Sequence, residues 1–131
     1  TKVQSQRPSN PSSISQAAAV AALNGDQHCV AEMVKAFKQR HDWLVAELNT
    51  IPGVKAIQAD GTFYAFVDVN AAIKAKGLTD DLELAAALLE AGVALVPGSA
   101  FGTQGCVRLS FATSNANLEK AVQRIRAYLT K

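Results

Sequence analysis

The spacing of apolar residues along the chain predicts two amphipathic helices. Between residues 26 and 49, apolar side chains recur mostly three, four or seven positions apart, as one face of a long helix requires. This face consists of Val30, Met33, Val34, Phe37, Leu44, Val45 and Leu48. A second stripe consists of Leu118, Val122, Ile125 and Leu129. It predicts a terminal helix that begins at Asn115 or Asn117, and both helices should bury these faces in a core.

Four other segments have the composition or the alternation of β-strands. Residues 54–58 and 62–69 are short β-prone runs joined by an Asp-Gly turn. Residues 93–98 form an apolar run that ends in Pro-Gly, which is typical of a buried strand. In 105–114, apolar residues alternate with small or polar ones, so one face of this strand should be buried.

Start and stop signals place the remaining helices. Asn10 as N-cap and Pro11 as first helical residue predict an alanine-rich helix that ends at Gly25. Its side chains are so small and apolar that we expect this helix to be packed closely against another surface. A further helix is expected over 79–91, capped by its first residue. Residues 70–78 are compatible with a short helix or a loop.

The resulting order is helix, helix, strand, strand, helix, strand, strand, helix. Short strands joined by hairpins and by one helical crossover predict an α+β fold. We expect a small, mostly antiparallel sheet of about four strands with helices packed over one face, preceded by the alanine-rich helix.

Composition narrows the class of protein. The chain has 131 residues, 49% of them hydrophobic, which is enough for one domain with a core of its own. A net charge of +2 gives no electrostatic reason to expect nucleic acid or an anionic membrane as partner. No apolar run approaches the ~20 residues that span a bilayer. Cys29 and Cys106 have neither metal-ligand spacing nor the density of a secreted disulfide scaffold. We therefore expect no metal site and a cytoplasmic location.

Arg108 is the strongest candidate for a functional residue. It carries the one full charge in 105–114, and no acidic residue is near it in sequence. A planar guanidinium on a strand beside a Gly-rich loop can bind a carboxylate through two parallel charge-assisted hydrogen bonds. The alternatives are an exposed arginine at a sheet edge and an ion pair with Asp68 or Glu90, and the residues alone leave these open.

Other candidate residues have equally good structural explanations. Ser9 and Asn10 precede a helix, whose free N–H groups suit a phosphate, although an ordinary N-cap explains them as well. Phe63 lies in an aromatic strand segment that packing in a core would explain. His28 and His41 have charged or polar neighbours on the long helix, and we expect both to be solvated.

Four segments together resemble a known family. They are SNPSSISQAAAVAAL, GTFYAFVDV, EAGVALVPGSAFG and VRLSFATSNANLEKAVQRI. They resemble the C-terminal portion of fold-type I, pyridoxal-phosphate-dependent aminotransferases, within the aspartate aminotransferase branch of class I. The resemblance runs from about Gln4 to the end of the chain, and its most specific part is the Val-Pro-Gly loop followed by an arginine-bearing strand.

The resemblance implies roles for individual residues. In this family an arginine at the position of Arg108 binds the substrate α-carboxylate, so the missing acidic partner would be the amino acid or 2-oxo acid itself. Phe63 would line the substrate pocket. Ser9 and Asn10 would approach the active site and the cofactor phosphate of the neighbouring subunit in a homodimer.

Departures from the family pattern imply that the chain is one part of an enzyme. No lysine has the neighbours of the Schiff-base lysine, so we expect no catalytic residue in this chain, no bound pyridoxal phosphate and no activity of the chain alone. Residues 1–25 would be a connecting segment and helix at the junction with the large domain, and 26–131 the small domain. The partners would be that large domain and a second copy. Two alternatives remain: a stand-alone regulatory domain that binds an amino acid, and a dimerisation module.

Overall fold

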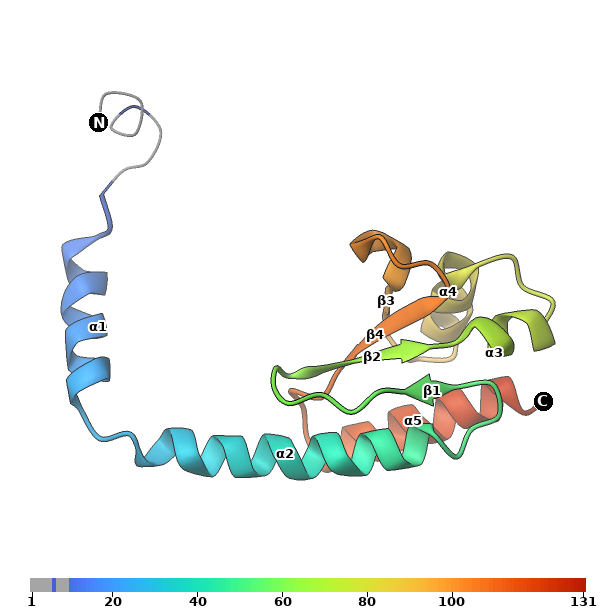
Figure 1. Cartoon of the computed structure of the whole chain (residues 1–131), viewed down its shortest axis with the longest axis horizontal. Coiled ribbons are helices and arrows are strands. Elements are labelled where there is room, and N and C mark those ends of the chain that lie inside the picture. Colours follow the sequence, from blue (N-terminus) through green and yellow to red (C-terminus); the bar gives the residue numbers. More distant parts are fainter. Residues whose placement is uncertain (1–5, 7–9) are drawn as a thin grey trace. The chain divides into compact units, whose positions relative to one another are not determined.

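The computed structural model describes residues 6 and 10–131 and divides the chain into two compact units, Thr1–Val34 and Lys35–Lys131. The helices are α1 (Ser13–Asn24), α2 (His28–Leu48), α3 (Asn70–Ala75), α4 (Asp81–Glu90), the 3-10 helix η2 (Gly98–Phe101) and α5 (Asn115–Leu129). The strands are β1 (Lys55–Ala56), β2 (Tyr64–Asp68), β3 (Val96–Pro97) and β4 (Cys106–Ser110), labelled in Figure 1. The predicted α+β class and element order are confirmed, with the ambiguous segment 70–78 containing the short helix α3.

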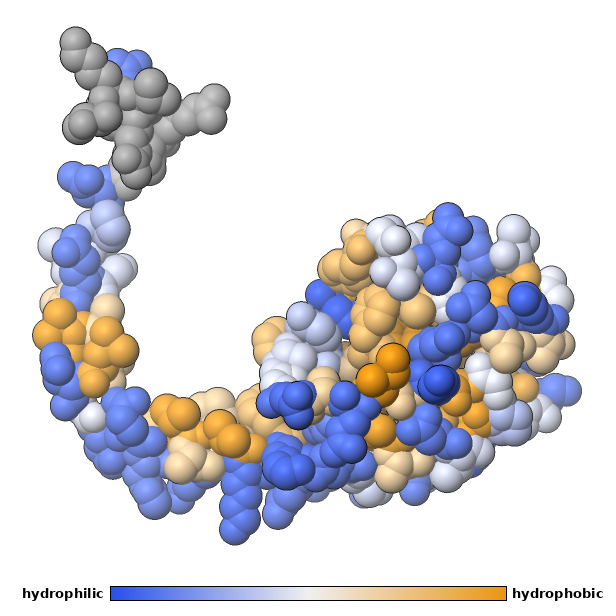
Figure 2. All heavy atoms as spheres, in the orientation of Figure 1, coloured by the Kyte–Doolittle hydropathy of each residue, from blue (hydrophilic) through white to orange (hydrophobic). Residues whose placement is uncertain are grey.

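The described part of the first unit is mostly helical and has an exposed apolar surface. Every residue of α1 is exposed, so the close packing expected for this helix stays a prediction about a surface outside the described residues. The large apolar side chains of this unit are exposed too, and orange atoms mark such positions along α1 in Figure 2. They are Ile14, Val20, Leu23, Val30, Met33 and Val34. The N-terminal half of the predicted α2 face is therefore uncovered in the described chain.

The start of α1 differs from the predicted one. The helix begins at Ser13 with Ser12 as N-cap, not with Asn10. The backbone N–H of Gln16 donates to the Ser12 carbonyl, at 3.0 Å, so Ser12 accepts the first helical hydrogen bond. Pro11 consequently lies before the cap, where its carbonyl accepts a bond from the Gln16 side chain.

The second unit is built on a four-stranded antiparallel sheet with the order β1-β2-β4-β3. Its central pair is β2 and β4, with Phe66 opposite Arg108. Alternate residues of these strands are buried, as the alternation in 105–114 predicted. β1 and β3 span two residues each, less than the predicted runs, and serve as short edges.

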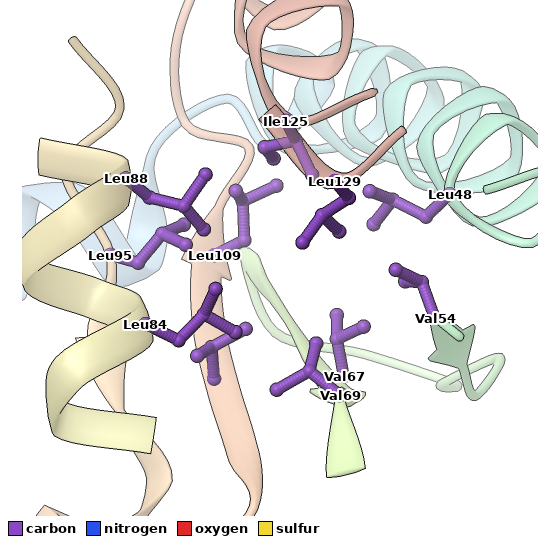
Figure 3. Close-up of a pocket in the computed structure, with 11 residues that line it drawn as sticks. Leu48, Val54, Val67, Val69, Leu84, Leu88, Leu95, Leu109, Ile125 and Leu129 are labelled. Carbon is purple, nitrogen blue, oxygen red and sulfur yellow. The ribbon is translucent and has the colours of Figure 1, made fainter. Parts of the chain in front are cut away.

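One face of the sheet carries the core. Val67, Val107 and Leu109 pack there against the C-terminal half of α2, against α4 and against α5. In Figure 1, α5 and this part of α2 run below the sheet. A cavity of about 20 Å³ lies within this core, and the apolar side chains that line it are drawn in Figure 3. Because the lining is wholly apolar, such a cavity stays dry.

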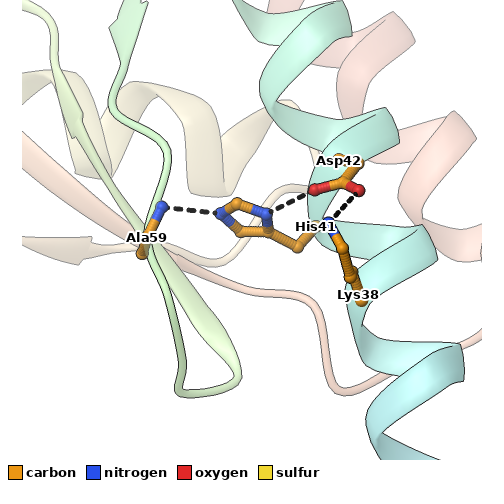
Figure 4. A network of polar contacts seen from close by, with 4 residues as sticks. All are labelled: Lys38, His41, Asp42 and Ala59. Carbon is orange, nitrogen blue, oxygen red and sulfur yellow. Dashed lines mark hydrogen bonds and ion pairs between the residues drawn. The ribbon is translucent and has the colours of Figure 1, made fainter.

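His41 is buried, which corrects the expectation that it is solvated. The residue is 5% exposed, and its ring packs edge-on against Phe111 with 5.6 Å between the ring centroids. Figure 4 shows the polar contacts: Nδ1 lies 3.1 Å from Asp42 Oδ1, and the Ala59 backbone N–H donates to Nε2 at 3.1 Å. This assigns the proton to Nδ1. The pKa of Asp42 is lowered, most strongly by the hydrogen bond from Lys38 and next by the one from His41.

The N-cap of α4 also differs from the prediction. Asp80, not Thr79, is the cap, because its Oδ1 accepts the Glu83 backbone N–H at 2.9 Å. Glu83 in turn accepts the Thr79 backbone N–H at 2.7 Å, so the two carboxylates satisfy the exposed donors of the first turn reciprocally.

None of the described helices has the length and apolar character that crossing a membrane requires.

Candidate functional site: an unpaired arginine in an aromatic cluster

Arg108 lies on the face of the sheet opposite the core. Its neighbours Val107 and Leu109 are buried in the core, and strand alternation therefore directs Arg108 to the other side. There it faces Phe66 across the β2–β4 pair and Val96 across the β3–β4 pair. The side chain is half-buried.

Two aromatic rings contact the Arg108 guanidinium. Its Cζ lies 5.1 Å from the centre of the Tyr64 ring on β2 and 4.7 Å from that of Phe101 on η2. Phe101 also packs edge-on against Phe66, at 6.4 Å between ring centres. Tyr64, Phe66 and Phe101 therefore form an aromatic cluster around one cation. Each ring attracts the cation through its quadrupole but does not replace a hydrogen-bond acceptor for the N–H groups.

No carboxylate pairs with Arg108 among the residues that the structure describes. The ion pairs of this part of the chain involve other residues. Glu90 is exposed, and Asp68 instead accepts the backbone N–H and the side-chain amide of Asn70, each at 2.9 Å. The backbone bond, followed by the side-chain bond, lowers the pKa of Asp68. The ion pairs considered from the sequence are therefore not formed.

A short loop holds Phe101 in this cluster. η2 closes on itself because the N–H groups of Gly102 and Thr103 donate to Ser99 and Gly98, each at 3.0 Å. The carboxylate of Asp81, which is fully buried at the start of α4, contacts this loop.

Asp81 binds backbone N–H groups from both ends of this loop. Its Oδ2 accepts from Ser99 at 2.8 Å and its Oδ1 from Gly105 at 3.1 Å. Burial of the carboxyl would raise the pKa of Asp81, but the hydrogen bonds from Ser99 and Gly105 outweigh it, and the pKa is lowered. The buried group is therefore held as a carboxylate.

The other predicted site residues are placed as follows. Phe63 is 53% exposed, and its ring lies 5.5 Å from that of Tyr64, so it borders the aromatic cluster through one intervening ring. Asn10 is exposed in the first unit. Ser9 lies outside the described residues. The structure thus brings Phe63 near Arg108.

Tyr64, Phe101 and Asp81 were missed as site residues by reasoning from the sequence. Tyr64 was available in principle, because strand pairing between 62–69 and 105–114 places its face beside Arg108. Phe101 and Asp81 lie on a loop and at a helix start, where no periodic signal indicates which side chains meet.

The described lysines are mostly exposed to solvent. Every described lysine is exposed except Lys76, which is half-buried and lies 5.0 Å from the centre of the Tyr128 ring. None of them lies in a desolvated pocket, which is one of the environments that activate a lysine as a nucleophile. Cys106 lies on the same face of the sheet as Arg108. The pKa of its thiol is raised, most strongly by burial and next by the negative charges of Asp68 and Asp81.

Comparison with known proteins identifies the family. The model for aminotransferase class I and II matches residues 2–125, and the chain belongs to this family.

Relatives agree with this assignment. An aspartate/prephenate aminotransferase of Nitrosomonas europaea is 49% identical over 98% of this chain and 34% of its own length. An asparagine–oxo-acid transaminase of Streptococcus mutans is 42% identical over 100% and 34%. The structure of an aspartate aminotransferase from Rhizobium meliloti superposes with a TM-score of 0.85 at 42% identity, over 98% of this chain and 34% of that one. The chain thus spans about a third of the length of these relatives.

Proposed function

We propose that this chain is the C-terminal part of a pyridoxal-phosphate-dependent aminotransferase of the aspartate aminotransferase type. In this proposal Arg108 binds the α-carboxylate of the amino-acid or 2-oxo-acid substrate, and the chain alone is inactive. The observation that carries it is the half-buried Arg108 guanidinium, which contacts two aromatic rings and pairs with no described carboxylate. Family membership favours an aminotransferase over a stand-alone regulatory domain or a dimerisation module.

The chemistry of the site suits a carboxylate ligand. A guanidinium has five N–H donors and no acceptor, so a partly desolvated one gains most from an anion with two oxygens. The rings of Tyr64 and Phe101 occupy space around the cation and restrict its rotation without using these donors. Arg108 is thereby prepared for two parallel N–H···O bonds, and these would fix the substrate Cα relative to the reacting groups.

The remaining parts of the enzyme belong, in this proposal, to the rest of the parent protein. The large domain would hold pyridoxal phosphate and supply the reactive lysine, and a second copy of the protein would complete a homodimer. Residues 1–25, with Ser9 and Asn10, would form the junction with the large domain and approach the neighbouring subunit, and 26–131 would be the small domain. Phe63 would line the pocket. The parent would be a cytoplasmic enzyme.

The test is steady-state transamination of L-aspartate and 2-oxoglutarate by the full-length protein. Removing one partner of a desolvated, bidentate ion pair costs about 3–5 kcal/mol. Arg108→Ala should therefore lower kcat/KM by roughly two to four powers of ten. Arg108→Lys should restore only part of this, because an ammonium is a point charge without the planar fork.

Arg40 provides a matched control. It is also half-buried and lies against an aromatic ring, with its Cζ 5.5 Å from the centre of Phe37, but on α2. Arg40→Ala should leave kcat/KM unchanged. Near-normal turnover by Arg108→Ala, with cofactor content equal to that of the wild type, would refute the proposed role.

A further inference from the structure

We propose that Asp81 is a positioning residue that holds the η2 loop so that Phe101 keeps the Arg108 guanidinium aligned for the substrate carboxylate. This inference rests on the proposed function of Arg108. It assigns a task to a buried charge that contacts neither Arg108 nor, in the proposed site, the substrate.

Asp81 fixes both ends of the loop that contains η2. Its carboxylate is fully buried and charged, a costly arrangement unless the charge is well satisfied. It is satisfied by backbone N–H groups of Ser99 and Gly105, 2.8 and 3.1 Å away, which lie at the two ends of one loop. A single side chain therefore fixes both ends of the segment.

The same loop connects Asp81 to Arg108. Phe101 lies between the two anchored residues, and its ring centre is 4.7 Å from Arg108 Cζ. Gly105 is also tied to the end of β2, since its carbonyl accepts the Val69 N–H at 2.9 Å. Arg108 follows Gly105 by three positions on β4. The Asp81 carboxylate thus controls both the ring that contacts Arg108 and the point at which the arginine-bearing strand begins.

The substitution Asp81→Asn tests this connection with little change of shape. An asparagine offers one carbonyl oxygen and one NH₂ group, so one of the two loop N–H donors loses its acceptor. Asp80→Asn is the matched control. It makes the same chemical change one residue earlier, and asparagine caps a helix as well as aspartate does.

The measured quantity is the ratio of kcat/KM for L-aspartate to that for β-alanine, which is aspartate without the α-carboxylate, in the full-length holoenzyme. Arg108→Ala should lower this ratio by about a hundredfold or more. Asp81→Asn should lower it by about tenfold to a hundredfold, as expected for a displaced binding group. Asp80→Asn should leave it unchanged. Amide exchange at Ser99 and Gly105, followed by mass spectrometry, should accelerate only in Asp81→Asn.

The outcomes separate this inference from the function on which it rests. An unchanged ratio in Arg108→Ala would overturn the proposed function, and this inference with it. A reduced ratio in Arg108→Ala, with Asp81→Asn indistinguishable from Asp80→Asn, would leave the function intact and overturn the positioning role.

A second variant covers the case in which Asp81→Asn does not fold. The Phe101 side chain is 50% exposed, so Phe101→Ala should fold normally. It breaks the same series of contacts at its last link and should lower the ratio in the same direction. An unchanged ratio in Phe101→Ala would show that the loop does not align Arg108, and would overturn the inference.

Discussion

Gly105 offers a quantitative test of how the loop before β4 is built. Its φ is +72°, a conformation that favours glycine, and its N–H and carbonyl are both bonded. A Cβ added here would overlap the side chain of Asn70. Gly102 in the same loop has a φ of +79°, but a Cβ there would meet nothing within 4 Å. Alanine at the two positions thus meets the same backbone strain with and without a steric clash.

The expected costs follow from these contacts. Gly102→Ala should lower the free energy of unfolding by about 1 kcal/mol, the cost of a left-handed conformation for a residue with a Cβ. Gly105→Ala adds the displacement of the Asn70 side chain, which donates to Asp68 at 2.9 Å. Losing that hydrogen bond costs about 1 kcal/mol more. Gly105→Ala should therefore destabilise roughly twice as much as Gly102→Ala.

Two assays distinguish the cost of backbone strain from the cost of displacing the Asn70 side chain. The chain has one tryptophan, Trp43, which packs against the core of the second unit, so its fluorescence during urea unfolding reports the stability of that unit. An NMR titration of Asp68 provides the second measurement. Because the Asn70 side chain contributes to lowering the pKa of Asp68, this pKa should rise toward its ordinary value in Gly105→Ala and stay unchanged in Gly102→Ala. Equal destabilisation by both variants, with an unshifted Asp68, would refute the steric account.

Three further predictions concern the core and the thiols. His41→Leu removes the acceptor of a loop N–H and should cost about 1–2 kcal/mol in urea unfolding, whereas the exposed His28→Leu should cost nearly nothing. Val54→Ile adds a methyl group toward the apolar cavity and should stabilise by about 0.8 kcal/mol; a loss would mean that the cavity cannot accept it. Because the pKa of the Cys106 thiol is raised, a smaller fraction of it is ionised at pH 8. Iodoacetamide should therefore modify the exposed Cys29 first, and faster labelling of Cys106 would contradict this.

Periodicity predicted the helices better than it predicted what covers them. Leu44 and Leu48 on α2 and the first three residues of the α5 stripe are buried, as their spacing indicated. Met33 and Val34 continue the α2 face but are exposed. Spacing identifies an apolar face, whereas its burial depends on a partner that the sequence pattern does not specify.

His41 shows a signal that was present but overlooked. It lies four residues after Phe37 and three before Leu44, and therefore on the apolar face of α2. Its polar neighbours in sequence suggested solvent, yet helical geometry directs those neighbours to other faces. Position on the helix, rather than local composition, determined its burial.

The site was predictable only in part. Alternation in 105–114 placed Arg108 on the face opposite Val107. A partner outside the chain, in contrast, was implied only by the resemblance to the aminotransferase family. The contact with Phe101 and the anchoring by Asp81 depend on how a loop closes over a helix start. Such contacts join residues without any regular spacing, so sequence reasoning had no basis for them.

The most direct test of the central claim is a crystal structure of the full-length protein with 2-methyl-L-aspartate, whose Cα has no hydrogen to lose. We expect both α-carboxylate oxygens to lie within about 2.7–2.9 Å of two Arg108 nitrogens, with Tyr64 and Phe101 still against the guanidinium. An α-carboxylate bound elsewhere, with Arg108 free of the ligand, would contradict it.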